Sequence, residues 1–288
     1  MILKTRTMRY IELAIPSFWI LPIVLFFSMQ IISIGMISFG FEILLPIAIL
    51  IIITSAFNSF NAVYDMKIDI INKRKRPLPS GKIKPREALR FSYLLYVLAI
   101  FLSLLTLNIE LIIITILNSV VTIVYSLPPI RLKGRFLLSN ITVALQYGVF
   151  PLLMSWSLYN SLSGFPFFFG FSVFFLAFSM SFTKDFEDYT GDKIYNCRTI
   201  AVAMGPKRAH LFGFFSIVLS FVIIGLFSVF GIFKGSFMWL LLILIPYSII
   251  YFKFMKNPEI YSRKLLIFSV FLSLITVFLM GIITVSGF

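Results

Sequence analysis

The sequence predicts an all-α membrane protein, with nine transmembrane helices in a single domain that spans residues 1–288. Three observations predict this fold class: the composition, the number of long apolar runs and the placement of the basic residues. Hydrophobic residues make up 60% of the 288 positions and charged residues 12%. Soluble domains average about 45–50% apolar and about 25% charged residues. A chain this apolar is expected to lie in a membrane.

The apolar runs supply the nine elements. A helix crosses the hydrocarbon core with about 20 apolar residues, and each crossing has to satisfy its own backbone polar groups. The runs of this length are centred near Leu21, Ile51, Val97, Ile116, Ala144, Phe174, Val222, Ile243 and Leu272. The first run follows the basic start MILKTRTMRY. Because it lacks a small-residue cleavage site, we interpret it as an anchor and not as a signal peptide.

The basic residues test this division into spans. If the N-terminus is cytoplasmic, all but one of the 25 Lys and Arg residues, Lys4 and Lys73 among them, fall in cytoplasmic segments; the exception is Lys234. Cytoplasmic segments of membrane proteins are rich in Lys and Arg, and one missed or added span would scramble this arrangement. The same rule explains the formal net charge of +14 without nucleic acid as a partner. We therefore expect a multi-pass protein of the cell membrane with a cytoplasmic N-terminus.

Acidic residues gather at two places, after the second and the sixth apolar run. These places hold Asp65, Asp69, Asp185, Glu187, Asp188 and Asp192, which are six of the 11 Asp and Glu residues. The pairs Asp65/Asp69 and Asp188/Asp192 are both spaced i, i+4, and residues with this spacing share one face of a helix. Two carboxylates about 6 Å apart repel by about 3 kcal/mol at an effective dielectric constant of about 20. A positive partner is therefore expected at both places.

Two kinds of positive partner fit the pattern. Neighbouring Lys and Arg residues can neutralise the carboxylates in a structural network of salt bridges, and a divalent metal ion is the alternative. His210 and Cys197 are single residues of their types, which excludes a His-based metal site and an internal disulfide. Oxygen ligands alone favour Mg²⁺ or a similar hard cation. Acids that hold a metal, surrounded by basic residues, describe a pocket for a diphosphate. The basic residues on this side of the membrane include Arg76, Lys133, Lys184 and Arg198.

The two acidic segments resemble a known pair of motifs. Asn61 lies one turn before Asp65 and can add a neutral oxygen ligand, with a helix-capping role as the alternative. The pattern N-x-x-x-D-x-x-x-D (61–69), followed by RPLPSG (76–81), resembles the first aspartate-rich motif of the UbiA superfamily of intramembrane prenyltransferases. KDFEDYTGD (184–192) resembles the second motif of that family, and both follow the spans where the family has them.

This resemblance implies a ring of nine helices around a central cavity that is open sideways to lipid. A cytoplasmic cap would carry the two motifs and the active site. The resemblance also implies the chemistry of the family, in which Mg²⁺ helps to ionise an isoprenyl diphosphate and the allyl group passes to a lipid-soluble acceptor. The expected cofactor is therefore Mg²⁺, and the expected partners are the two substrates and the membrane lipid.

The resemblance and the charge pattern together assign roles to individual residues. The metal ligands would be Asn61, Asp65, Asp69, Asp185, Asp188 and Asp192. The diphosphate would be held by Asn61, Arg76, Lys133, Lys184 and Arg198. The catalytic residues would be Asp65, Asp69, Asp188, Asp192 and Tyr125. Tyr125 and Lys133 come from YSLPPIRLKG (125–134), a loop that is longer here than in many family members. We expect the aromatic face of Tyr125 to stabilise the allylic cation.

The acceptor is inferred from two short segments. RPLPSG and RTIAVAMG (198–205) look most like the archaeal digeranylgeranylglyceryl phosphate synthases. That likeness implies transfer of a geranylgeranyl group to the free hydroxyl of geranylgeranylglyceryl phosphate, which forms the second ether bond of archaeal lipids. An aromatic acceptor of a quinone or chlorophyll-type pathway is the alternative. A transporter is a remote alternative, because transporters bind their substrates near the midplane of the membrane, whereas the acidic residues here lie at the ends of apolar runs. A CDP-alcohol phosphotransferase would contain the element D-G-x-x-A-R and six spans. Both acidic segments lack this element, and nine spans are predicted here. No obligate protein partner is expected.

Overall fold

The computed structural model describes residues 6–72, 74–258 and 260–286, so that Lys4 and Lys73, counted above as cytoplasmic, lie outside the described residues. Within these ranges the chain is helical and contains no strand. The described residues form nine helical stretches that are long and apolar enough to span a membrane: Pro16–Ile34, Phe41–Tyr64, Pro85–Leu105, Ile109–Ser126, Leu138–Trp156, Phe165–Ile194, Pro206–Val229, Gly235–Phe254 and Ser262–Val285. Each stretch contains one of the nine predicted centres. The predicted fold class is therefore confirmed.

Six of these spans are single helices: α3 (Phe41–Tyr64), α5 (Pro85–Leu105), α6 (Ile109–Ser126), α9 (Phe165–Ile194), α11 (Pro206–Val229) and α13 (Ser262–Val285). The other three are composite. The first joins η1 (Pro16–Trp19) to α2 (Ile20–Ile34), the fifth joins α7 (Leu138–Ala144), the π turn η3 (Leu145–Val149) and α8 (Phe150–Trp156), and the eighth joins η4 (Gly235–Ile243) to α12 (Leu244–Phe254). In the fifth span, Pro151 has no N–H to donate to a regular α-helix, and the π turn directly precedes the helix that contains it.

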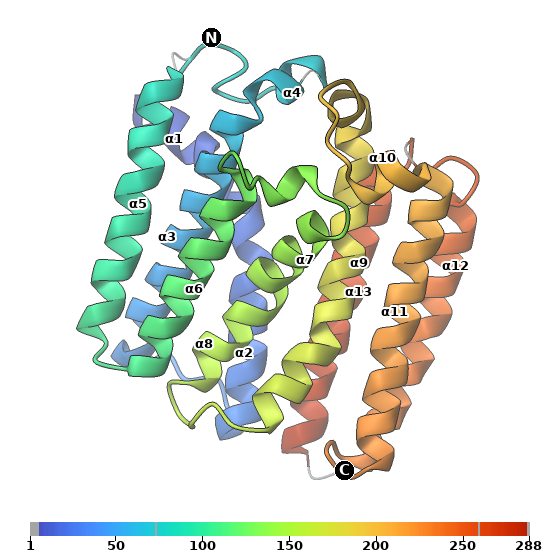
Figure 1. The fold of residues 1–288 in the computed structure, drawn as a ribbon. Helices are drawn as coiled ribbons and strands as arrows, with labels where there is room; N and C mark the ends of the chain where they lie inside the picture. Colours follow the sequence, from blue (N-terminus) through green and yellow to red (C-terminus); the bar gives the residue numbers. More distant parts are fainter. Residues whose placement is uncertain (1–5, 73, 259, 287–288) are drawn as a thin grey trace.

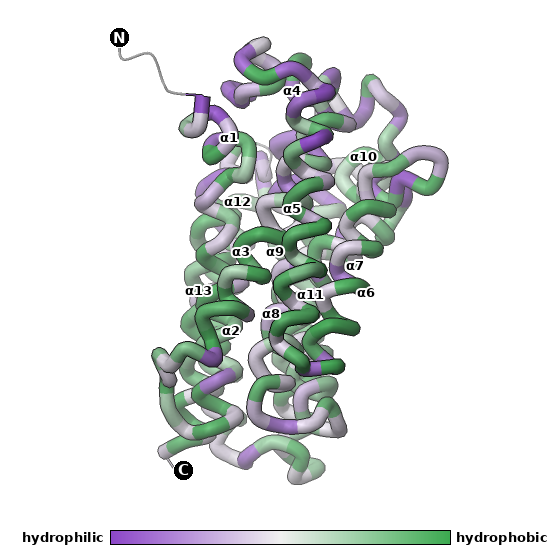
Figure 2. The backbone as a smooth tube through the Cα atoms, turned by 90° about the vertical axis from the view of Figure 1, so that its left-hand side faces the viewer, coloured by the Kyte–Doolittle hydropathy of each residue, from purple (hydrophilic) through white to green (hydrophobic). Residues whose placement is uncertain are grey.

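The short elements gather at one end of the bundle. They are α1 (Arg6–Ala14), α4 (Met66–Ile71), η2 (Leu132–Gly134) and α10 (Ile200–Met204). Figure 1 shows α1, α4 and α10 at this end, whereas α13 finishes at the opposite end. Hydrophilic backbone is concentrated at the same end in Figure 2, and hydrophobic backbone fills the middle of the bundle. We call this the motif end, because the segments between α3 and α5, α6 and α7, and α9 and α11 lie there.

The buried apolar side chains form two large clusters. One is built mainly on α3, α5 and α6, and the other on α9, α11, η4, α12 and α13, while α2 and α8 contribute to both. In lipid, such helices associate through close van der Waals packing and not through a hydrophobic driving force. α2 also packs against α13, which brings the first and the last span together. The two aspartate-rich segments belong to helices of different clusters, and they meet at the motif end.

Candidate active site

The first aspartate pair lies at a break between two helices. α3 ends at Tyr64, Asp65 has φ −94° and ψ 3°, and α4 begins at Met66. The backbone N–H of Asp69 still donates to the carbonyl of Asp65 at 2.8 Å, so the one-turn relation expected from the spacing persists across the break. Both aspartates are buried. The break lets α4 reach across the motif end toward α9, as Figure 1 shows.

Each of these two aspartates has a basic partner. Lys133 Nζ donates to Asp65 Oδ2 at 2.5 Å, and Arg131 Nη2 lies 3.5 Å from Asp65 Oδ1. Arg76 Nη1 donates to Asp69 Oδ2 at 3.0 Å. Burial raises the pKa of the Asp69 carboxyl above its ordinary value, and the nearby charge of Arg76 opposes this rise without cancelling it. The negative charges of the first segment are therefore balanced by the basic side chains of Arg76, Arg131 and Lys133.

The second acidic segment lies on the last turns of α9. This helix has 30 residues and is about 45 Å long at 1.5 Å per residue, whereas the hydrocarbon core is about 30 Å thick. Asp185, Asp188 and Asp192 are buried on these turns. Arg74 donates from Nη2 to Asp188 Oδ1 at 2.7 Å and from Nη1 to Glu187 Oε2 at 2.8 Å. A basic residue that follows α4 thus holds the acidic turns of α9.

The segment around α4 contacts α9 directly. Asn72 Nδ2 donates to both the carbonyl and Oδ1 of Asp188 at 3.3 Å, and the N–H of Gly191 donates to Asn72 Oδ1 at 3.0 Å. A Cβ atom on Gly191 would lie 2.8 Å from Asn72 Nδ2 and 3.0 Å from the carbonyl oxygen of Ile68. Glycine at this position therefore allows the close approach. The structure brings together two aspartate-rich segments that are far apart in the sequence.

Lys133 lies between the two segments. Its Nζ is 3.7 Å from Asp192 Oδ1 as well as bonded to Asp65. Burial disfavours the charged form of Lys133, but the carboxylates of Asp65 and Asp192 outweigh it and raise the pKa well above its ordinary value. Asp192 itself is 0% exposed, and neither of its carboxylate oxygens has a hydrogen-bond partner. A buried carboxylate in this state retains the capacity to bind a further cation.

The aspartates of the two segments and the basic side chains bonded to them form one group around Lys133, which we call the cluster. The residues of the cluster fit Mg²⁺ in their chemistry. All the acidic and amide donors are oxygens, which Mg²⁺ prefers, and the unbonded oxygens of Asp192 provide acceptor capacity. Within the described part of the chain, no three acidic, His or Cys side chains stand close enough together to hold a metal ion. Three of the carboxylates, those of Asp65, Asp69 and Asp188, are paired with basic side chains. The salt-bridge network expected from the neighbouring Lys and Arg residues is therefore present.

Two further predicted ligands have polar partners of their own. Asn61 Nδ2 donates to Ser126 Oγ at 3.3 Å. Asp185 Oδ2 accepts a hydrogen bond from Asn140 Nδ2 at 3.0 Å, and the same amide donates to Ser181 Oγ at 2.7 Å. These contacts fix both side chains in the interior of the bundle. Their assignment as metal ligands stays a prediction.

Three buried aromatic side chains, Phe57, Tyr125 and Tyr147, form a group near the cluster, which we call the aromatic group. Tyr125 packs edge-on against Phe57, with ring centroids 5.2 Å apart, and Tyr147 lies 6.0 Å from Phe57. Phe18 packs against this buried group, and Lys184 Nζ lies 5.8 Å from the centroid of its ring. The structure thus places Lys184 beside an aromatic face, whereas Lys133 takes the central position among the carboxylates.

The basic residues differ from the sequence prediction in detail. Arg198 is exposed and forms no ion pair within the described residues, and its recorded contact is a backbone N–H bond to the carbonyl of Gly134 at 3.0 Å. Its assignment to the diphosphate stays a prediction. Sequence reasoning overlooked four residues that hold the cluster together, namely Asn72, Arg74, Arg131 and Asn140. Two of them had a signal in the sequence: Arg74 belongs to the basic run 73–76, and Arg131 lies in the loop 125–134 close to Lys133. Basic residues at these positions are equally consistent with a topology signal.

Comparison with known proteins places the chain among intramembrane enzymes. A model of the UbiA prenyltransferase family matches residues 20–275. The chain is 30% identical over 236 residues to the digeranylgeranylglyceryl phosphate synthase of Methanosphaera stadtmanae. The aligned region covers 82% of this chain and 83% of that relative. The protein of the same name from Saccharolobus solfataricus is 30% identical over 212 residues, or 72% of this chain and 73% of the relative.

Solved structures share the fold. The structure of a digeranylgeranylglyceryl phosphate synthase matches with a TM-score of 0.71 at 24% identity, over 97% of this chain and 99% of that one. A UbiA homologue from Archaeoglobus fulgidus, solved with DMAPP and Mg²⁺, matches with a TM-score of 0.66 at 19% identity, over 97% and 100% of the two chains. At these identities the likeness establishes the fold alone.

Proposed function

Because this chain belongs to the UbiA prenyltransferase family, we propose that it transfers a geranylgeranyl group from geranylgeranyl diphosphate to the free hydroxyl of geranylgeranylglyceryl phosphate. One observation carries the proposal: the buried Lys133 lies between the carboxylates of Asp65, at the break between α3 and α4, and Asp192, on α9, and both oxygens of Asp192 are without a hydrogen bond. The names of the relatives from Methanosphaera stadtmanae and Saccharolobus solfataricus support this acceptor.

The diphosphate headgroup would bind at the contact of α4 with α9. Lys133 and Arg76 provide positive charge beside the carboxylates, and they would take diphosphate oxygens in charge-assisted hydrogen bonds. Asp65, Asp69, Asp188 and Asp192 would hold Mg²⁺, with Asn61 and Asp185 beside them. The bound metal would supply positive charge that stabilises the departing diphosphate. Donors that are fixed in place before the reaction contribute a large part of such stabilisation.

The aromatic group would protect the allylic carbon of the donor. Tyr125, Phe57 and Tyr147 present ring faces in a buried setting, where a cation–π contact is worth up to about 2 kcal/mol. The same side chains would exclude water, which otherwise captures the allylic cation. The hydroxyl of the acceptor would then attack this carbon, and its proton would pass to a carboxylate of the cluster or to a diphosphate oxygen.

We also propose that the motif end faces the cytoplasm. Arg6, Arg9 and the segments that hold Lys67–Arg90, Arg131–Arg135 and Lys184–Arg208 supply most of the basic residues of this end. The excess of Lys and Arg in cytoplasmic segments of membrane proteins supports this orientation. Both substrates are lipids, and they would reach the cluster from the membrane.

A direct assay tests the acceptor and the metal together. The purified full-length protein in phospholipid vesicles is given Mg²⁺, labelled geranylgeranyl diphosphate and either geranylgeranylglyceryl phosphate or an aromatic acid. We expect labelled diether only with the lipid acceptor, no product in EDTA, and recovery when Mg²⁺ is restored in excess. Product from the aromatic acid alone would overturn the lipid acceptor, and undiminished product in EDTA would overturn the dependence on metal.

A further inference from the structure

A pocket lies between α12 and α13, apart from the aspartate-rich segments. Its volume is about 570 Å³, within the range of about 300–1,000 Å³ that is usual for small-ligand sites. The pocket is lined by Lys253, Phe254, Tyr261, Lys264, Ile267 and Phe268. Two of these side chains are basic and four are apolar or aromatic. None of them takes part in the cluster around Lys133, so the pocket needs a different explanation.

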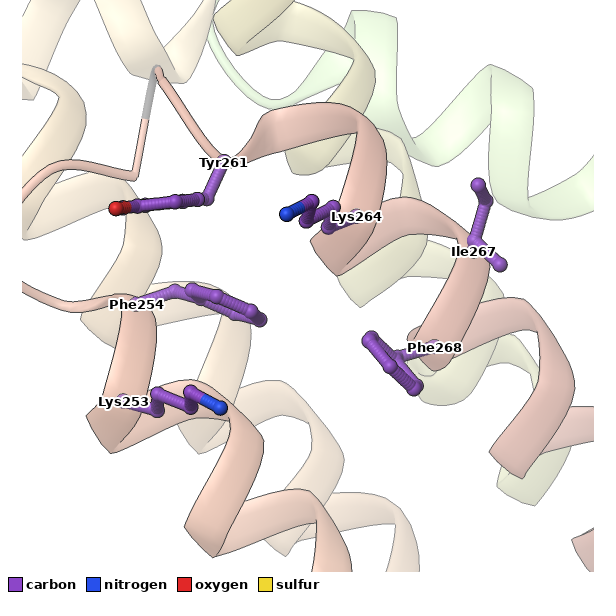
Figure 3. A pocket seen from close by; sticks show the side chains of 6 residues that line it. All are labelled: Lys253, Phe254, Tyr261, Lys264, Ile267 and Phe268. Atoms are coloured by element: carbon purple, nitrogen blue, oxygen red, sulfur yellow. The ribbon is translucent and has the colours of Figure 1, made fainter.

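The basic groups frame the pocket from two helices. Lys253 lies in the last turn of α12 and Lys264 in the first turn of α13. Figure 3 shows both ammonium groups directed toward the space between the helices. Each Nζ lies 6.0 Å from the ring centroid of a neighbouring aromatic residue, Phe254 for Lys253 and Tyr261 for Lys264. These two rings stack with centroids 5.0 Å apart, which holds the end of α12 to the start of α13.

The lysines have no acidic partner within the described residues. No carboxylate among those the structure describes lies within 4.0 Å of either ammonium group, and Glu259 of the connecting loop lies outside the described residues. Two positive charges directed into one space repel each other. An anion between them would remove this repulsion, so the charge of the pocket is complementary to an anionic group.

The apolar wall points to an occupant that also carries hydrocarbon. Ile267 and Phe268 lie about one turn further along α13 than Lys264, and they are 60% and 43% exposed. Figure 3 shows them on the side of the pocket opposite Phe254 and Tyr261. In a membrane-spanning helix these exposed side chains face acyl chains, and aromatic residues gather at the level of the headgroups. A free inorganic anion would leave this wall without a partner.

We infer that the pocket binds an anionic phospholipid of the surrounding bilayer, with its phosphate between Lys253 and Lys264 and a hydrocarbon chain along Ile267 and Phe268. Basic residues at a membrane surface attract anionic lipids in this way. The site lies between the last two spans and draws on no residue to which a catalytic role is assigned above. A bound lipid here would bridge α12 and α13 and stabilise their contact.

The test compares two double variants of the full-length protein, in each of which two basic residues are replaced by glutamine. Wild type is compared with Lys253→Gln/Lys264→Gln and with the control Lys207→Gln/Arg208→Gln. Each double variant loses two positive charges, and the control pair is also exposed and lies at the motif end. Each protein in detergent is titrated with phosphatidylglycerol, phosphatidylcholine or inorganic phosphate. Native mass spectrometry measures the affinity for phosphatidylglycerol. Hydrogen–deuterium exchange measures the protection of residues 250–258 and 260–268.

We expect phosphatidylglycerol to bind the pocket variant about 30-fold more weakly than wild type, since each lysine near an anionic headgroup contributes to the attraction. The control variant keeps the protection of both segments, and Lys253→Arg/Lys264→Arg keeps the affinity. Phe268→Ala, which retains both charges, weakens binding of the lipid. Equal loss in the control pair, or equal protection by phosphatidylcholine, would overturn the site. Equal protection by inorganic phosphate would overturn a lipid as the occupant.

Discussion

The two aspartate-rich segments of this protein have the same i, i+4 spacing but balance their charges differently. In the α3–α4 segment each carboxylate is bonded to a basic group, Asp65 to Lys133 and Asp69 to Arg76. In the α9 segment Asp188 is bonded to Arg74, whereas Asp192 is fully buried, has only Lys133 Nζ at 3.7 Å, and has no hydrogen bond to either of its oxygens. The difference teaches that spacing alone does not distinguish a hydrogen-bonded carboxylate from one with open acceptor capacity. The open acceptor capacity lies on α9.

The largest effect is expected from removing this open carboxylate. Asp192→Asn keeps the size of the side chain and removes its charge, so we expect turnover with Mg²⁺ to fall about 100-fold or more, as when a group that stabilises transition-state charge is lost. Thermal stability should stay at or above the wild-type level, because the variant removes a buried charge that has no hydrogen bond and therefore costs free energy. Product formation from labelled geranylgeranyl diphosphate and the thermal midpoint measure the two effects.

The matched control is Glu187→Gln on the same helix. Glu187 accepts a hydrogen bond from Arg74 but is not among the proposed ligands, so this variant should keep turnover within about threefold of wild type. Near-normal turnover in Asp192→Asn would show that the α9 segment is structural.

The next effect concerns the residue that compensates the α9 segment. Arg74→Gln leaves Asp188 and Glu187 without their cation. Breaking a buried ion pair costs about 3–5 kcal/mol, and because the Arg74 side chain is 19% exposed we expect a lower cost of about 2–4 kcal/mol. Thermal unfolding in detergent measures the loss. Arg6→Gln is the control, because Arg6 pairs with Glu87 at 77% exposure and such pairs contribute little. Similar midpoints for the two variants would contradict a structural role of Arg74.

A smaller effect is expected where the two segments touch. Gly191→Ala places a methyl group within 3.0 Å of Asn72 and Ile68, so α4 has to move away from α9. Overpacking of this kind costs about 1–3 kcal/mol, and turnover should fall as well because the two segments separate. The control is Gly170→Ala on the same helix, where the added atom meets only Val149 Cγ1 at 3.4 Å. Equal stability and turnover in both variants would show that the approach of α4 to α9 is not tight.

The smallest effect lies at the opposite end of the bundle. Lys234, the exception to the distribution of basic residues, donates from Nζ to the carbonyl oxygens of Thr284 at 2.7 Å and Ile283 at 3.4 Å. These carbonyls end α13, where a cation stabilises the helix by about 0.3–1 kcal/mol. We expect Lys234→Gln to lower the unfolding free energy by about that amount and to leave turnover unchanged. Lys207→Gln at the motif end should show no such loss. A midpoint of Lys234→Gln equal to that of wild type would remove this explanation of the exception.

The sequence predicts the spans because each crossing is a continuous apolar run whose length is set by the bilayer. It predicts the acidic residues of the site because charged pairs at the ends of apolar helices are costly without a partner. It could not identify Arg74 within the run 73–76, since the break after Asp65 directs the chain toward α9 and no local pattern encodes that direction. Asn72 and Gly191 meet only through the packing of helices distant in the sequence.

The position of the cations in the chain has a consequence for biogenesis. Arg74 and Lys133, which pair with the acidic turns of α9, both precede that helix in the sequence, and synthesis proceeds from the N-terminus. When the ribosome delivers the sixth span, its carboxylates meet counter-charges that are already anchored at the same membrane surface. The acidic turns of α9 therefore have basic partners in segments that are synthesised before them.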